Sequence, residues 1–215
     1  MKQTMLRWSV YLLGLIFLAF GIALSIKTSL GISPISSVAF SISEIWHINL
    51  GVMNFAVYAV FVVAQFAMRG KNSRVIDLLQ LVVSFIFSWA LAWIVAGISY
   101  NAADHSFWEN IVLLVVATVF IGIGVSASLQ MKLIPNPGDG IVQALAELTK
   151  WEQGFAKNMF DIGCVCFTTA MGLLFAGKPI GIGVGTVVSM LGAGRVVALT
   201  NRFVMKKLCA AAGVA

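Results

Sequence analysis

Asp139 is the side chain in this sequence best placed to do chemistry, because it stands between two glycines directly after the run Pro135-Asn136-Pro137-Gly138. Prolines and glycines interrupt a helix, so Asp139 lies where a new helix begins. Aspartate suits such a start, because its carboxylate accepts backbone N–H bonds and faces the positive end of the helix. The alternative is a membrane-buried carboxylate that binds a cation or takes up a proton. A capping carboxylate that faces a cavity would fill both roles.

A second helix breaker, Pro34, is surrounded by hydroxyl groups instead of a carboxylate. Ser33, Ser36 and Ser37 lie within three residues of it, and hydroxyls with free N–H groups at a helix start can hold an anion. The same small side chains serve as helix caps or packing residues, so both interpretations stay open.

Three further polar residues, Asn54, Asp161 and Arg195, interrupt apolar runs. Lys157 precedes Asp161 by four residues, so an ion pair on one helix face would make Asp161 an ordinary interface charge. Arg195 lies about one turn from the end of its run and can extend to water; alternatively, it faces a central cavity and recognises a carboxylate or phosphate. The candidate substrate- or ion-binding residues are Ser33, Ser36, Ser37, Asn54, Asn136, Asp139, Asp161 and Arg195.

Catalytic residues, metal sites and cofactors are not expected. His47 and His105 stand without partner histidines, and the apolar runs contain no His-Glu-x-x-His motif or Ser/His pair. The glycines between Gly181 and Thr186 follow no strand and precede no lysine at the spacing of a phosphate-binding loop. We therefore expect a protein that is not an enzyme and that is not driven by nucleotide hydrolysis.

The elements that position these residues are membrane helices. Of the 215 residues, 60% are hydrophobic and 10% are charged, and the mean hydropathy is +0.98, whereas a soluble domain carries about 25% charged residues. The net charge is +6, but the basic residues are scattered between apolar runs, whereas a nucleic-acid binder gathers them on one face. We expect a lipid bilayer as the surrounding medium and no nucleic acid as a partner.

Six apolar stretches are long enough to cross the bilayer, because about 20 helical residues span its hydrocarbon core of about 30 Å. The first lacks a small-x-small cleavage site, so we interpret it as a helix and not as a signal peptide. The predicted spans are Trp8–Ile26, Leu50–Met68, Val75–Ile98, Ile111–Leu129, Met159–Gly177 and Ile180–Leu199.

Two shorter segments that contain the breakers, Leu30–Trp46 and Leu133–Trp151, are ambiguous. With six crossings and the N-terminus inside, 11 of the 14 basic residues face the cytoplasm, as the positive-inside rule requires. Counting both segments as crossings would move the cluster Arg69–Arg74 and Lys132 outside. We therefore predict a multi-pass protein of the plasma membrane with both termini cytoplasmic and both segments re-entrant.

An internal repeat relates residues 8–98 to residues 111–204. Each repeat has three crossings and a broken segment after the first, and an odd number of crossings turns the second copy upside down. The predicted fold is an all-α polytopic membrane protein, one membrane domain over residues 1–215 with two inverted 3+3 repeats, an architecture that recurs in secondary transporters. Chance similarity between apolar sequences is the alternative. Within residues 21–51, the identical pairs at an offset of 103 are Gly21/Gly124, Ser25/Ser128, Leu30/Leu133, Pro34/Pro137, Glu44/Glu147 and Gly51/Gly154.

Three glycine-containing elements carry a resemblance to a known family, Gly31-Ile32-Ser33-Pro34, Pro137-Gly138-Asp139-Gly140 and Gly181-Ile182-Gly183-Val184-Gly185-Thr186. In length and in motif order the chain resembles the bacterial YczE/YyaS/YitT-type integral membrane proteins. The resemblance implies a small plasma-membrane protein with a proposed transport role and no established catalytic residues.

The leading hypothesis is a secondary transporter, or permease, for an unidentified small solute, with protons as the candidate coupling ion. The alternative is a non-transporting accessory membrane protein that helps a partner to fold, localise or assemble. Because six spans enclose only a thin pore, we expect a homodimer.

Overall fold

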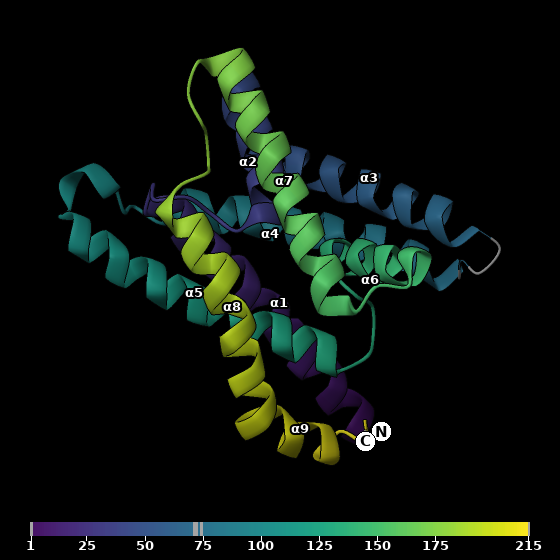
Figure 1. Cartoon of the computed structure of the whole chain (residues 1–215). Helices are drawn as coiled ribbons and strands as arrows, with labels where there is room; N and C mark the ends of the chain where they lie inside the picture. The colour runs from purple at the N-terminus through teal and green to yellow at the C-terminus, as the bar shows by residue number, and fades with distance from the viewer. Residues whose placement is uncertain (1, 71–72, 74, 215) are drawn as a thin grey trace. The chain divides into compact units, whose positions relative to one another are not determined.

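The structure, a computed structural model, describes residues 2–70, 73 and 75–214, and these are folded into helices joined by turns and short loops (Figure 1). Six helices are long and apolar enough to cross a membrane, as predicted for a multi-pass protein. Five of the spans correspond to α1 (Lys2–Lys27), α3 (Leu50–Arg69), α4 (Leu79–Gly97), α5 (Phe107–Gln130) and α7 (Gln153–Ala176). The sixth span, Val184–Ala211, begins with α8 (Val184–Thr200) and continues beyond it.

Two short helices begin at the predicted breakers. Both α2 (Pro34–Trp46) and α6 (Pro137–Thr149) start at a proline, whose fixed φ suits the first turn of a helix. Each has 13 residues and is therefore about 20 Å long, too short to cross a hydrocarbon core of about 30 Å. The two ambiguous segments are thus short helices, and their re-entrant path stays a prediction.

The last long helix begins four residues later than predicted. Gly181 has a φ of +75°, a left-handed conformation that favours glycine, so the helix does not start at the beginning of the apolar run. The N–H of Gly185 donates to the carbonyl of Leu30 over 2.7 Å. A Cβ on Gly183 would lie 2.3 Å from that same oxygen, so only glycine allows this close approach.

The described chain divides into two compact units, each with helices from both halves of the sequence. In the first unit, α1 packs along α5. A Cβ on Gly21 or Gly124 would lie 2.7 or 2.5 Å from a backbone nitrogen of the opposite helix, so small residues let these helices pack closely. The unit comprises the described parts of residues 1–33, 93–133 and 183–215, with a π-helical turn (Asn201–Met205) and α9 (Lys206–Ala211) after α8.

The second unit contains α2, α3, most of α4, α6 and α7. Here α2 packs against α7, and α3 against α6. Val57 and Cys164 are buried at its apolar centre, where the rings of Phe61 and Phe160 meet edge to face at 5.5 Å. This centre joins α3 to α7, so helices from the two halves of the chain share one core. The unit covers residues 34–92 and 134–182.

Candidate functional site

The interior of the second unit is rich in polar side chains. Burying such a group without a hydrogen bond costs roughly 1–3 kcal/mol in proteins, so the partners of each side chain show what it does. Within the described part of the chain, Asp161 is the one charged member of this buried set, at 4% exposed. The set comprises Ser36, Ser37, Ser41, Ser43, Asn54, Gln65, Gln80, Ser84, Ser88, Asn136, Asp161 and Thr168.

Asn136 caps the start of α6. Its side-chain oxygen accepts a bond from the N–H of Gly138 at 3.0 Å, and its carbonyl accepts one from the N–H of Asp139 at 2.9 Å. The expectation that Asp139 is the N-cap is therefore wrong: Pro137 occupies the first helical position and leaves the cap to the residue before it. The Asn136 side chain also bonds to the hydroxyl of Tyr58 on α3. Asp139 is thus free of the capping role and available for other contacts.

Asp139, Lys157 and Asp161 form a cluster of charges between α6 and α7. The Nζ of Lys157 pairs with the Oδ1 of Asp161, as the spacing predicted, and both side chains act electrostatically on Asp139. Burial raises the pKa of the Asp139 carboxyl to about 6, an effect that Lys157 opposes and Asp161 reinforces. The raised pKa brings the titration of the Asp139 carboxyl closer to neutral pH. Within the described residues, no group of three His, Cys, Asp or Glu side chains could hold a metal ion.

A reciprocal amide pair holds the first turn of α6 against α3 and α4. The Nε2 of Gln65 and the Oε1 of Gln80 lie 3.3 Å apart, as do the Nε2 of Gln80 and the Oε1 of Gln65. Gln65 also donates to the carbonyl of Pro137 over 3.2 Å. A Cβ on Gly140 would lie 2.5 Å from the Oε1 of Gln65. The amides therefore occupy the space that glycine leaves open.

Hydroxyl and amide bonds also join other helices of this unit. The Oγ of Ser37 on α2 donates to the carbonyl of Pro34 over 2.7 Å and lies 3.1 Å from the Oγ1 of Thr168 on α7. The Nδ2 of Asn54 on α3 donates to the Oγ of Ser88 on α4 over 2.8 Å. Ser37 and Asn54 thus bind neighbouring helices.

Arg69 links the end of α3 to the end of α6. Its Nε and Nη2 donate to the two carboxylate oxygens of Glu147 over 2.9 and 3.2 Å, a bidentate geometry that fixes both partners. Its Nη1 also contacts Asp77 at 3.4 Å, in the 3-10 helix (Val75–Leu78) that precedes α4. Arg69 therefore connects three elements around α6.

The structure brings several of the sequence-predicted residues into one unit and leaves two in the other. Asp139 and Asp161 share the charged cluster, Asn136 borders it, and Ser36 is buried in the first turn of α2. Ser33 and Arg195 belong to the first unit, where Arg195 is exposed on α8. The sequence interpretation missed Tyr58, Gln65, Gln80 and Thr168, although glutamines inside apolar runs were a visible signal.

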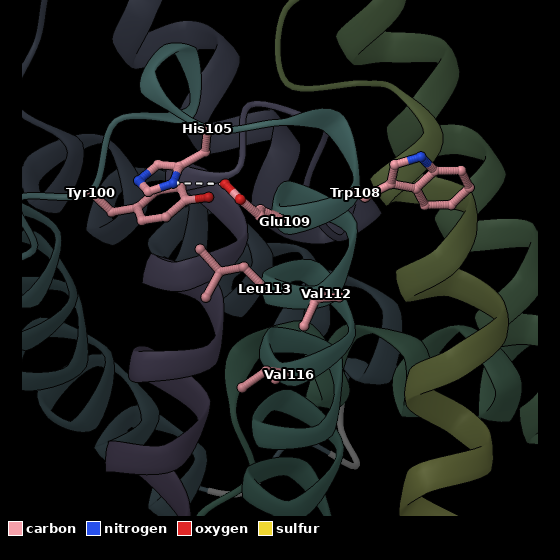
Figure 2. Close-up of a pocket in the computed structure, with 7 residues that line it drawn as sticks. All are labelled: Tyr100, His105, Trp108, Glu109, Val112, Leu113 and Val116. Carbon is pink, nitrogen blue, oxygen red and sulfur yellow. Dashed lines mark hydrogen bonds and ion pairs between the residues drawn. The ribbon is translucent and has the colours of Figure 1, made fainter.

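The first unit carries an open pocket of about 490 Å³ beside the start of α5 (Figure 2). The ring of His105 stacks on that of Tyr100 with centroids 4.3 Å apart, and its Nδ1 lies 3.0 Å from the Oε2 of Glu109. The hydroxyl of Tyr100 donates to Asn110 over 2.8 Å. The pocket is lined by Tyr100, His105, Trp108, Glu109, Val112, Leu113 and Val116.

Comparison with known proteins supports the family resemblance. The sequence model of the "Family of unknown function (DUF6198)" matches residues 5–202. The "Uncharacterized membrane protein YczE" of Bacillus subtilis (strain 168) is 27% identical over 185 residues, which cover 85% of this chain and 81% of that protein. The "Uncharacterized protein YyaS" of the same organism is 22% identical over 178 residues, 83% of this chain and 85% of the relative. No solved structure matches the chain.

Proposed function

The chain belongs to the DUF6198 family, and we propose that it is a secondary transporter that moves a small solute across the bacterial plasma membrane. The observation that carries this proposal is the charged cluster of Asp139, Lys157 and Asp161 inside a unit built from apolar helices. Ionisable groups within membrane proteins are costly and commonly mark an ion or substrate pathway.

Asp139 is the residue that we propose exchanges a proton during transport. When Asp139 is ionised, two carboxylates share the single ammonium of Lys157, and when it is protonated, the Lys157–Asp161 pair remains. One proton thus changes the net charge of the cluster from −1 to zero. A solute that contacts the cluster would bind the two states differently, which is the requirement for coupling.

Contacts that recur at an offset of 103 residues support the inverted repeat. Ser37 on α2 meets Thr168 on α7. The residues 103 positions away, Gly140 on α6 and Gln65 on α3, also meet. In each contact one residue donates to the carbonyl of an aligned proline: Ser37 to Pro34, and Gln65 to Pro137. A two-fold relation between the repeats predicts such paired contacts.

The apolar centre of the second unit follows the same relation. Val57 is aligned with Phe160, and Phe61 with Cys164, and all four side chains meet where α3 and α7 approach each other. Exchanging each of these residues for its counterpart 103 positions away gives the same set of four residues. A two-fold axis that passes between α3 and α7 predicts such a self-related contact. Secondary transporters built from inverted repeats bind their solutes where the repeats meet, and the charged cluster involves α7 itself.

We extend the proposal to the arrangement in the membrane. Both termini are cytoplasmic, as the distribution of basic residues favours, and α2 and α6 enter the membrane and return on the same side. The protein works as a homodimer and catalyses no covalent chemistry.

Transport is tested with purified protein in proteoliposomes that contain a pH-sensitive dye and face a panel of small solutes. We expect at least one solute to drive proton flux in the wild type. Asp139→Asn should abolish uptake driven by a proton gradient and leave part of the solute exchange. Glu44→Gln is the matched control, because Glu44 is an exposed carboxylate on α2. The absence of flux for every solute contradicts the transporter, and unchanged driven uptake in Asp139→Asn contradicts the proton site.

A further inference from the structure

Arg195 is a charged side chain well inside an apolar helix, and no side chain of the described residues neutralises it. The sixth span covers Val184–Ala211, and a crossing of the hydrocarbon core takes about 20 residues. Every stretch of that length within the span includes Arg195. Among the described residues, its guanidinium has no hydrogen-bond or ion-pair partner, and the side chain is exposed. A charge at membrane depth is costly and is almost always paired, so we expect a negatively charged group from outside this chain to meet it.

The helix face around Arg195 is open and positively charged. Of the six spans, the one that contains Arg195 has the smallest buried share in its apolar window, 17%. A Cβ on Gly194 would have no neighbour within 4 Å, so the backbone beside Arg195 is uncovered. Arg202 follows seven residues later, which is about two helical turns, so it lies on roughly the same side and is also exposed. Residues 184–215 contain no aspartate or glutamate, so this face attracts an anion.

Apolar side chains continue the same face in the other direction. Leu191 and Val184 precede Arg195 by four and eleven residues, a spacing that places all three on one side of a helix. Leu191 is 57% exposed and Val184 is 56% exposed. Along the helix, the face thus changes from cationic at Arg202 to apolar at Val184. A phospholipid changes in the same order, from its phosphate to its acyl chains.

We propose that this face, formed by Arg195, Arg202, Leu191 and Val184, binds an anionic phospholipid. The phosphate accepts hydrogen bonds from the guanidinium groups, whose planar forks of donors suit phosphate oxygens. Arg195 extends its flexible side chain towards the headgroup level, and an acyl chain covers Leu191 and Val184. A zwitterionic phospholipid carries the same phosphate, but its ammonium group weakens the attraction to a face without carboxylates. This site is independent of the proposed transport activity.

The test compares phosphatidylglycerol with phosphatidylethanolamine at equal concentrations, and native mass spectrometry counts the lipids that stay bound to the purified protein. We expect the wild type to prefer phosphatidylglycerol. Arg195→Gln and Arg202→Gln should each reduce that preference about two- to fivefold, the range that an exposed ion pair supplies. Lys178→Gln is the matched control, because it removes the same charge from an exposed side chain outside the sixth span. This variant should keep the wild-type preference.

Equal retention of both lipids by the wild type, or an unchanged preference in both arginine variants, would overturn the proposal. An equal fall in Lys178→Gln would overturn it too, because the effect would then follow net charge alone. Water-soluble glycerol phosphate should not displace the lipid, since it has no chain to cover Leu191, and displacement would indicate a site for a free phosphate group. A change from dimer to monomer in Arg195→Gln without a change in lipid preference would instead assign Arg195 to a contact with a second copy.

Discussion

Replacing Asp139 with Asn should stabilise the protein at neutral pH and leave its stability unchanged in acid. Burial raises the pKa of the Asp139 carboxyl from 3.8 to about 6. Because the folded-state pKa lies above the unfolded value, the folded state binds more protons between these pH values. Stability therefore falls as the pH rises through this window, and the full penalty is present above pH 6.

The magnitude follows from the size of the shift. About two pKa units correspond to roughly 3 kcal/mol, and the carboxyl remains partly exposed, so we expect a penalty of about 1–3 kcal/mol. For a chain of 215 residues, this predicts a melting temperature roughly 3–9 °C higher for Asp139→Asn than for the wild type at pH 7.5. The charged groups that act on Asp139, Lys157 and Asp161, are present in both proteins.

The assay is thermal unfolding of the purified protein in detergent, measured from pH 4 to pH 8. The difference in melting temperature between the wild type and Asp139→Asn should be largest above pH 6 and should disappear near pH 4. Glu44→Gln should follow the wild type throughout. A variant that is less stable than the wild type at pH 7.5, or a difference that does not change with pH, would refute the argument from burial.

Three further predictions test the surroundings of Asp139. In a variant whose native cysteines are replaced, Asp139→Cys should react faster with a water-soluble thiol reagent than Ser36→Cys, because Asp139 is partly exposed and Ser36 is buried. If neither introduced cysteine reacts, the result favours an accessory protein without an aqueous pathway. Gly140→Ala should lower the free energy of unfolding by about 1–3 kcal/mol, because the added methyl group displaces the buried Gln65–Gln80 pair. Gly163→Ala is the control, because no neighbour lies within 4 Å of its added Cβ, and thermal unfolding should show no such loss. Glu147→Gln should lower the free energy of unfolding by at most about 1 kcal/mol, as for an exposed ion pair, and this loss should shrink in high salt. Arg69→Gln should lower the free energy of unfolding further, because it also leaves the mostly buried Asp77 without its Arg69 contact. Equal losses for the two variants would contradict this role of Arg69.

The membrane helices were predictable because hydropathy and length act locally. The prolines at positions 34 and 137 placed the starts of the short helices, and the four-residue spacing placed the Lys157–Asp161 pair. The late start of α8 was not predictable, because the segment before it is held by the carbonyl of Leu30, far away in the sequence. Hydropathy alone extends the helix through those apolar residues.

The individual polar residues of the site were visible in the sequence, but their grouping was not. Asn136 could have been recognised as the N-cap, because a proline in the first helical position leaves that role to the preceding residue. The electrostatic interaction of Asp139 with Lys157 and Asp161, and the pairing of Gln65 with Gln80, depend on how helices distant in the sequence pack against one another. The division into two interleaved units likewise depends on contacts between distant parts of the chain.

The proposed two-fold relation assigns the charges of the site to one half of the chain. Contacts that hold α2 against α7 and α3 against α6 recur in both repeats, so they would stabilise two exchanged conformations to a similar extent. The charged residues have neutral counterparts, so under this proposal protonation would act on one repeat only and would shift the balance between the two conformations, by a factor of ten for each 1.4 kcal/mol. In the proposed transporter, two symmetric repeats with charges in only one of them would allow a proton to direct the exchange. The aligned pairs are Ser36/Asp139, Asn54/Lys157 and Tyr58/Asp161.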